Sequence, residues 1–172
     1  LMKFSNGYWL GKDQYIINSP LQVYEAVKVD QSESSRSSDE LKVYAAYHEI
    51  NSRSDMLDVG NSTISVFSPG KDIIGVELKH FDDDKKDPLY ELKTSNTEVE
   101  STVSDDYATL TSGDLEIQIN LKNKFNVNFN YRGNRITGSE FKAQASITDL
   151  SGQKLGEVMH PNTVIGAQSL LP

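Results

Sequence analysis

The stretch "LEIQINLKNKFNVNFNYRGNRIT", residues 115–137, decides the fold class of this chain. Apolar residues stand at 115, 117, 119 and 121, and again at 125, 127, 129 and 131, with polar residues between them. An alternation of period two predicts two β-strands, each with one buried face and one wet face. Because only residues 122–124 separate the two strands, we expect a hairpin. Gly133 and Asn134 can take positive φ, so a further turn is predicted to lead into a third strand at 135–137.

Five earlier segments repeat the same pattern less regularly. They lie at residues 21–29, 41–47, 62–68, 73–81 and 107–113, and each ends near Gly, Pro, Asn or Asp. Since no window predicts a helix of more than about three turns, these short strands indicate an all-β fold, an antiparallel β-sandwich. Residues 30–40 form a polar, serine-rich stretch that we interpret as a mobile linker between two strands. No internal repeat and no second boundary is visible, so residues 1–172 are expected to form a single domain.

The composition limits the partners and the compartment. The chain has 172 residues, a formal charge of −8 and no cysteine, which excludes disulfides, thiolate nucleophiles and cysteine-bound metals. Nucleic acid and anionic membrane surfaces require a positive field, which this charge does not provide. There is no apolar run of about 20 residues and no signal-peptide layout. We therefore expect a cytoplasmic protein whose partner is a neutral ligand or another protein.

Motifs for catalysis or metal binding are not apparent. The histidines His48, His80 and His160 are widely separated, and the acidic loop at 82–87 lacks the spacing of an EF-hand. The sequence contains no nucleophile-elbow motif and no phosphate-binding glycine motif, and no pair of carboxylates is singled out by its spacing. From the residues alone we predict no catalytic residue, no cofactor and no metal.

Several segments nevertheless resemble a known enzyme family. They are the opening "MKFSNGYWL" with "SPLQVYEAVKVD", then "LKVYAAY", "FSPGKDIIGVELKHF", and "YATLTSGDLEIQIN" with "FNVNFNYRGNRITGSEFK". In order and spacing, over residues 2 to about 150, they closely resemble the N-terminal part of bacterial α-xylosidases of glycoside hydrolase family 31. The opening segment is the most specific to that branch, whereas the later segments are shared more widely across the β-sandwich domains of the family.

The resemblance implies an antiparallel sandwich related to galactose-mutarotase-like domains, a supersandwich, which packs on a catalytic (β/α)₈ barrel of the same parent chain. The parent would be a retaining glycosidase acting on α-xylosyl or α-glucosyl oligosaccharides, with its two aspartates on barrel loops. Neither the barrel nor the nucleophile motif K-T-D-F-G-E is present in this sequence, so no catalytic residue can be transferred. After Gly166 the sequence departs from the family pattern. We therefore expect the sandwich to be incomplete at its C-terminus, with an exposed edge that could pair with a second copy as a homo-oligomer.

Three functions remain open at this stage. The favoured one is a non-catalytic N-terminal domain of an α-xylosidase-like hydrolase, which supports the barrel and the rim of the substrate cleft. The alternatives are a free-standing carbohydrate-binding module and a structural or assembly domain of a truncated relative. Candidate contacts with a ligand or a neighbouring domain are His80, Phe81, Tyr90 and Trp9. Because neighbouring strand residues point to opposite faces, Tyr8 and Trp9 cannot form one sugar platform, and we interpret Trp9 as an anchor of the first strand.

Overall fold

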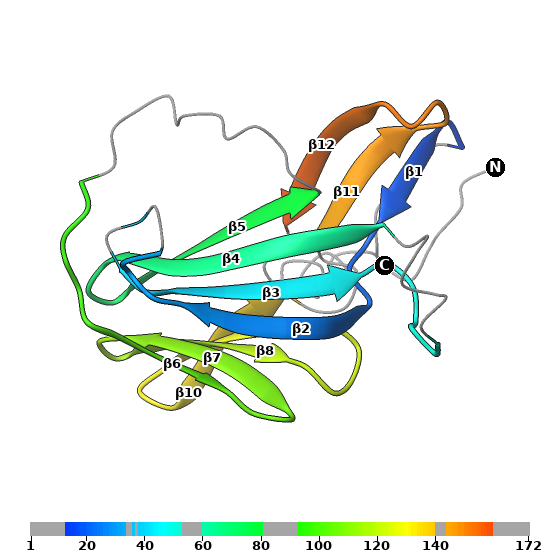
Figure 1. Cartoon of the computed structure of the whole chain (residues 1–172). Coiled ribbons are helices and arrows are strands. Elements are labelled where there is room, and N and C mark those ends of the chain that lie inside the picture. Colours follow the sequence, from blue (N-terminus) through cyan, green and yellow to red (C-terminus); the bar gives the residue numbers. More distant parts are fainter. Residues whose placement is uncertain are drawn as a thin grey trace, which may run out of the picture.

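The computed structural model describes residues 13–33, 36, 38–52, 60–80, 93–139 and 144–159. All regular elements in these residues are β-strands, and paired strands run antiparallel (Figure 1). The strands are β1 (Tyr15–Asn18), β2 (Gln22–Val29), β3 (Glu40–Ala46), β4 (Asn61–Gly70), β5 (Ile73–His80), β6 (Val99–Val103), β7 (Tyr107–Ser112), β8 (Leu115–Asn120), β9 (Val127–Tyr131), β10 (Asn134–Ser139), β11 (Gln144–Asp149) and β12 (Lys154–Met159). The prediction of an all-β, antiparallel sandwich is confirmed.

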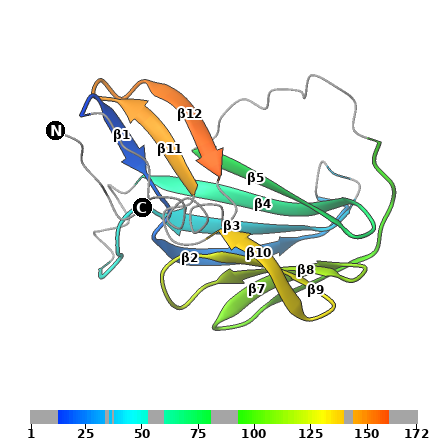
Figure 2. The same cartoon turned by 180° about the vertical axis from the view of Figure 1, so that it is seen from behind.

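Two sheets lie face to face and enclose the core. A four-stranded sheet has the order β2-β3-β4-β5, and a five-stranded sheet has the order β10-β9-β8-β7-β6 (Figures 1 and 2). Fully buried aliphatic side chains from both sheets meet between them, among them Leu41, Val43, Ile64, Val66, Leu110, Ile117 and Ile119. Each such side chain stabilises the fold by about 1.5–3 kcal/mol through the apolar surface it removes from water.

The hairpin predicted at residues 115–131 is formed by β8 and β9. Ile117 lies opposite Phe129 and Ile119 opposite Val127, so apolar residues of the two strands share the core face. The intervening glutamine and asparagines face away from the core, as the alternation predicts. Both the strands and their register therefore follow from the period-two pattern.

The turn between β9 and β10 differs from the prediction at one residue. Tyr131 pairs with Asn134, so the two central residues of the turn are Arg132 and Gly133, with φ of 50° and 76°. A two-residue turn with positive φ at both central positions is the type I′ turn, whose twist matches that of a hairpin. Asn134 instead begins β10, so the prediction of positive φ there was wrong, and Arg132 takes that conformation.

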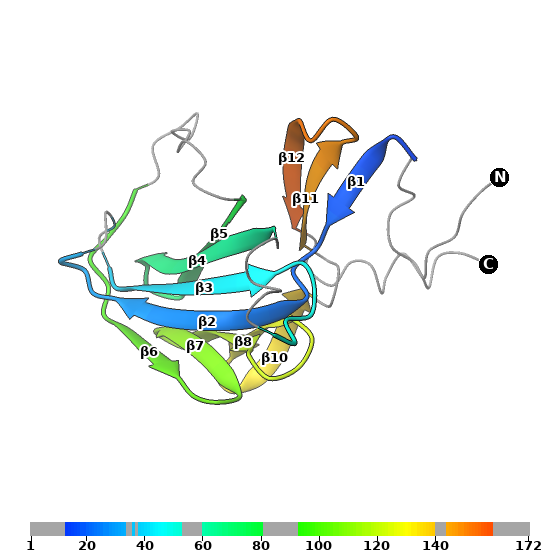
Figure 3. The ribbon, with the colours of Figure 1, turned by 45° about the vertical axis from the view of Figure 1, so that its right-hand side comes forward.

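A third sheet stands at one end of the sandwich. It has the order β1-β11-β12 and lies beside the start of β2 and the start of β4 (Figure 3). We call this end of the sandwich the proximal end, and it carries residues 19–21, 47–51, 104–106 and 121–126. The opposite end, called the distal end, carries the turns at 71–72, 113–114 and 132–133. The predicted incompleteness at the C-terminus concerns residues that the structure does not describe.

The stretch between β2 and β3 contacts the outer face of the four-stranded sheet. The Arg36 guanidinium lies 3.5 Å from the ring centroid of Phe67 and forms ion pairs with Glu77 and, at 3.8 Å, with Glu40. Ser38 is buried, and its hydroxyl donates to the carbonyl oxygen of Ser68. The far end of the 30–40 stretch is therefore held against β4 and β5, while the mobility of the stretch as a whole stays a prediction.

Candidate functional site

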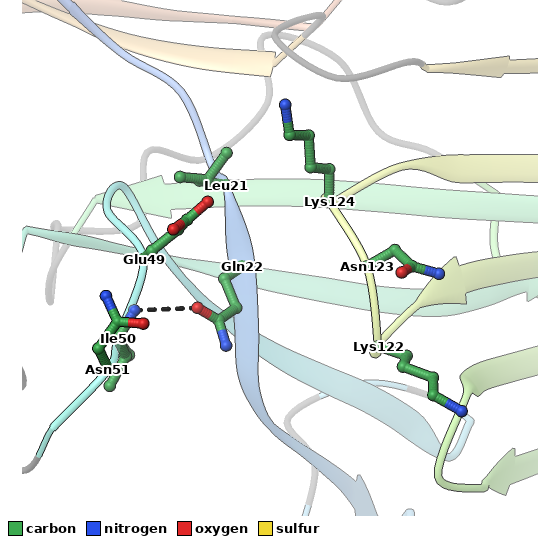
Figure 4. Close-up of a pocket in the computed structure, with 8 residues that line it drawn as sticks. All are labelled: Leu21, Gln22, Glu49, Ile50, Asn51, Lys122, Asn123 and Lys124. Carbon is green, nitrogen blue, oxygen red and sulfur yellow. Dashed lines mark hydrogen bonds between the residues drawn. The ribbon is translucent and has the colours of Figure 1, made fainter.

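A polar cavity of about 280 Å³ opens at the proximal end, between the start of β2 and the loop that joins β8 to β9 (Figure 4). Its lining comes from three segments that are far apart in the sequence. The lining residues are Leu21, Gln22, Glu49, Ile50, Asn51, Lys122, Asn123 and Lys124. Figure 4 shows residues 21–22 and 49–51 on one side of the cavity and residues 122–124 on the other.

Backbone hydrogen bonds hold these three segments together. The Leu21 N–H donates to the Ala46 carbonyl oxygen, and the Phe125 N–H donates to the Leu21 carbonyl oxygen, each at 2.8 Å. The Gln22 Oε1 accepts from the Ile50 N–H at 2.9 Å, which fixes the side-chain amide against one wall. The segments around the cavity are therefore held in place mainly by main-chain hydrogen bonds, with Gln22 as the one side chain among these bonds.

The loop from β8 to β9 is shaped by a single side chain. The Asn120 Oδ1 accepts from the N–H groups of Lys122 and Asn123 at 3.0 and 2.9 Å, which is an Asx-type turn. The Leu121 N–H donates to the Asp106 carbonyl oxygen at 2.8 Å and ties this turn to the loop before β7. The turn at 122–123 is therefore held from two sides.

A second cavity of about 300 Å³ lies on the other side of that turn. It is lined by Asp106, Tyr107, Asn120, Lys122 and Asn123, so it shares Lys122 and Asn123 with the first cavity. The Lys122 ammonium lies 3.0 Å from the Asp106 carboxylate, and the Tyr107 side chain is 39% exposed. We call the two cavities together the proximal cleft.

The chemistry of the proximal cleft is that of hydrogen bonding without net charge. Glu49 and Asp106 carry negative charge and Lys122 and Lys124 positive charge, so the formal charges cancel, although the chain as a whole carries −8. Asparagine and glutamine side chains supply both donors and acceptors. In the described part of the chain, no three His, Cys, Asp or Glu residues are grouped so that they could hold a metal ion. Nor is any helix there long and apolar enough to cross a membrane.

An aromatic pair lies elsewhere, on the outer face of the four-stranded sheet. The ring centroids of Tyr24 and Tyr44 are 6.2 Å apart and the ring planes are inclined by 33°. The Asn61 Nδ2 donates to the Tyr24 hydroxyl at 3.3 Å, and burial raises the pKa of Tyr24, helped by the nearby Glu25 and Tyr44. The rings are not coplanar, so they do not form the flat platform that a carbohydrate-binding module of the kind considered above would need.

Only one of the four residues proposed from the sequence as contacts, His80, lies among the described residues. His80 is the last residue of β5, and its backbone pairs with Ser62 near the proximal end. Trp9, Phe81 and Tyr90 lie outside the described residues. Their roles stay predictions.

The proximal cleft was missed by the sequence analysis, which interpreted residues 122–124 only as a hairpin loop. One local signal was present. An asparagine at the end of a strand, followed by a polar loop, is typical of an Asx turn that presents its neighbours to solvent. The partners of this loop, Gln22 and Glu49, are too far away in the sequence for any spacing rule to connect them.

The described residues form an antiparallel β-sandwich with a polar cleft at one end, and the formal charges that line this cleft cancel. No family model matches the chain. The chain is similar to Alpha-xylosidase XylQ of Lactiplantibacillus pentosus, with 38% identity over 146 residues. The matched region covers 85% of this chain but 18% of that enzyme, so the chain spans about a fifth of the relative's length. The resemblance to bacterial α-xylosidases is therefore confirmed.

Proposed function

We propose that this chain is a non-catalytic N-terminal β-sandwich domain of an α-xylosidase-like glycoside hydrolase of family 31. The observation that carries the proposal is the 38% identity to Alpha-xylosidase XylQ over most of this chain and a minor part of that enzyme. The domain would support a catalytic barrel in the same parent protein and contribute to the rim of its substrate cleft. The parent would be cytoplasmic and would cleave α-xylosyl or α-glucosyl oligosaccharides.

Two carboxylates among the described residues lack the surroundings of a catalytic acid in a retaining glycosidase. A retaining glycosidase needs a carboxylic acid whose pKa is raised so that it can protonate the leaving group. At Asp149 the shift has the opposite direction, because a hydrogen bond from the Ser151 hydroxyl and backbone N–H groups lower the pKa of its carboxyl. A retaining pair must also face each other across the bond that is cleaved. In the proximal cleft, by contrast, the Asp106 carboxylate is paired with Lys122.

The three-stranded sheet supports the idea that another domain packs on this one. Tyr15, Ile16 and Ile17 of β1 are 37–41% exposed, and Leu150 and Leu155, at and after the β11–β12 turn, are 70% and 51% exposed. Exposed apolar side chains on both faces of one small sheet are typical of an element that contacts another protein or domain. A structural or assembly role within the parent protein would use the same surface.

A chimera tests this function. The matching region of Alpha-xylosidase XylQ is replaced by this chain, and hydrolysis of a chromogenic α-xyloside is measured. We expect the chimera to be active and this chain alone to be inactive, because the catalytic groups lie outside it. A matched control chimera carries Val43→Asp, which places a charge in the core and should abolish the support. Turnover by this chain alone, in proportion to its concentration, would contradict the proposal.

A further inference from the structure

The proximal cleft contains polar groups that the protein itself leaves unused. Gln22 accepts a hydrogen bond through Oε1, whereas its Nε2 has no hydrogen bond to any of the described residues. The same holds for the side chains of Glu49 and Asn123 within the described part of the chain. Asn120 lines the second cavity, is only 8% exposed and uses its Oδ1 to hold the turn, whereas its amide nitrogen has no hydrogen bond to the described residues. Donors and acceptors at fixed positions around a cavity are what orients a polar ligand.

We propose that the proximal cleft binds a neutral carbohydrate, a pyranose or short oligosaccharide, with the turn at Lys122 and Asn123 between two sugar subsites. The cavities, of about 280 and 300 Å³, lie just below and at the lower limit of about 300 Å³ for small-ligand sites, which suits one sugar ring in each. Hydroxyl groups both donate and accept hydrogen bonds, so they match amide side chains, which do the same. This inference does not depend on the proposed function, because the site lies entirely on this chain.

Tyr107 supplies the apolar contact that sugar recognition needs. It is the first residue of β7, lies opposite Asn120 of β8, and is 39% exposed beside the second cavity. An aromatic ring can cover the C–H face of a pyranose while the amides bind its hydroxyls. Because the ring lies at the cavity's edge and not in the core, a ligand can reach it.

The charges argue for a neutral ligand rather than an anion. The Lys122 ammonium is already paired with Asp106 at 3.0 Å, and the Glu49 carboxylate lines the first cavity. A phosphate or carboxylate ligand that bound Lys122 would have to break this ion pair, and in either cavity it would lie near a carboxylate. A neutral ligand can hydrogen-bond to the ion pair without separating it.

A cavity of the same size at the distal end provides a contrast. It also measures about 280 Å³ and is lined by Gln31, Ser38, Asp39, Asn96, Thr97, Glu98 and Val99. Here the two amides bind each other, since Gln31 Nε2 donates to Asn96 Oδ1 at 3.2 Å. Among the described residues, its lining has two carboxylates, with no cation and no aromatic ring. Size and amide content are therefore matched, but among the described linings of these cavities a cation and an aromatic ring occur only in the proximal cleft.

The test is a titration of the whole chain followed by amide chemical shifts in NMR spectra. The probes are methyl α-D-xylopyranoside, glucose and cellobiose, with glucose 6-phosphate as the charged comparison. We expect saturable shifts confined to residues 106–107 and 120–124 and to Gln22, at millimolar sugar. Glucose 6-phosphate should bind no more tightly than glucose.

Variants separate this site from a general surface effect. Tyr107→Ala should weaken binding about fivefold, from the loss of one aromatic contact. Asn123→Ala should weaken it by a similar factor, and because that side chain makes no hydrogen bond to the described residues, the fold should be unaffected. Asn96→Ala in the distal cavity is the matched control and should leave the affinity unchanged. The proposal is overturned by shifts that do not saturate, by equal effects of Asn123→Ala and Asn96→Ala, or by preferential binding of glucose 6-phosphate.

Discussion

Substitution of Gly113 by alanine tests how two turns at the distal end are locked together. Gly113 has φ of +61°, and a Cβ at this position would lie 2.2 Å from the Asp72 Oδ1. That oxygen accepts a hydrogen bond from the Asp114 N–H at 2.6 Å. Alanine would therefore both force an unfavourable backbone conformation and push the Asp72 carboxylate off its donor. Gly133 provides the matched control, because its φ is +76° and no atom lies within 4 Å of its Cβ position.

The losses of stability caused by the two substitutions should differ by the free energy of the hydrogen bond between the Asp114 N–H and the Asp72 carboxylate. A left-handed conformation costs a non-glycine residue about 1 kcal/mol. Loss of a hydrogen bond to an exposed carboxylate adds about 1–2 kcal/mol. For a domain of this size, each kcal/mol lowers the melting temperature by about 2–4 °C. We therefore expect Gly133→Ala to lower it by about 2–4 °C, and Gly113→Ala by about 5–10 °C.

Thermal unfolding followed by circular dichroism measures both values. In an Asp72→Ala background the carboxylate is gone, so Gly113→Ala should cost no more than Gly133→Ala, which is the non-additivity expected of groups in contact. Equal melting temperatures for the two glycine variants in the unmodified chain would refute the reasoning. They would mean that the contact between the turns contributes nothing to stability.

Three further predictions concern the core and two titrating groups. Leu110→Ala removes a fully buried side chain and should lower the free energy of unfolding, measured by denaturant titration, by about 3 kcal/mol. Ile136→Ala, at a 59% exposed position, should change the free energy of unfolding by less than about 0.5 kcal/mol. Equal losses in the two variants would contradict the assignment of the core. The pKa of Asp149 is lowered chiefly by the Ser151 hydroxyl, so its contribution to stability is present above the pKa of the unfolded chain and is lost as the pH falls through the folded value. Ser151→Ala should move the pKa of Asp149 back toward its ordinary value in an NMR titration, and an unchanged pKa would show that the backbone donors suffice. The raised pKa of Tyr24 predicts that its phenolate forms at a higher pH than that of an exposed tyrosine. The contribution of Tyr24 to stability is therefore lost as the pH rises through its pKa in the folded chain. Absorbance titration of the Tyr24→Phe variant against the unmodified chain identifies which ionisation step belongs to Tyr24.

The strands with one wet face were predictable, whereas those with two covered or two exposed faces were not. In β8 and β9 the polar residues face away from the core and the alternation is clear. In β11, Gln144 and Ser146 are buried although they are polar, so the pattern that marks a half-buried strand is inverted. In β1 both faces are exposed instead, since Ile16 and Ile17 point to different faces and each is 41% exposed. Neither strand shows the period-two signal, because neither has one dry and one wet side.

The candidate site was not predictable from the sequence for a different reason. The proximal cleft joins Gln22, Glu49, Tyr107 and Asn123, which come from four loops or strand ends, and only the pairing of the two sheets places them at one end. Loop residues also lack the periodicity on which the strand predictions rest. The family resemblance, by contrast, was visible because it depends on local motifs, and the identity to Alpha-xylosidase XylQ confirms it.

The central claim is that this chain supports catalysis that resides elsewhere in an α-xylosidase-like protein. The most direct measurement is hydrolysis of a chromogenic α-xyloside by Alpha-xylosidase XylQ from which the region matching this chain has been removed, with and without this chain added as a separate protein. The account predicts little activity from the shortened enzyme and recovery that saturates as this chain is added. Full activity of the shortened enzyme in the absence of this chain would contradict the account.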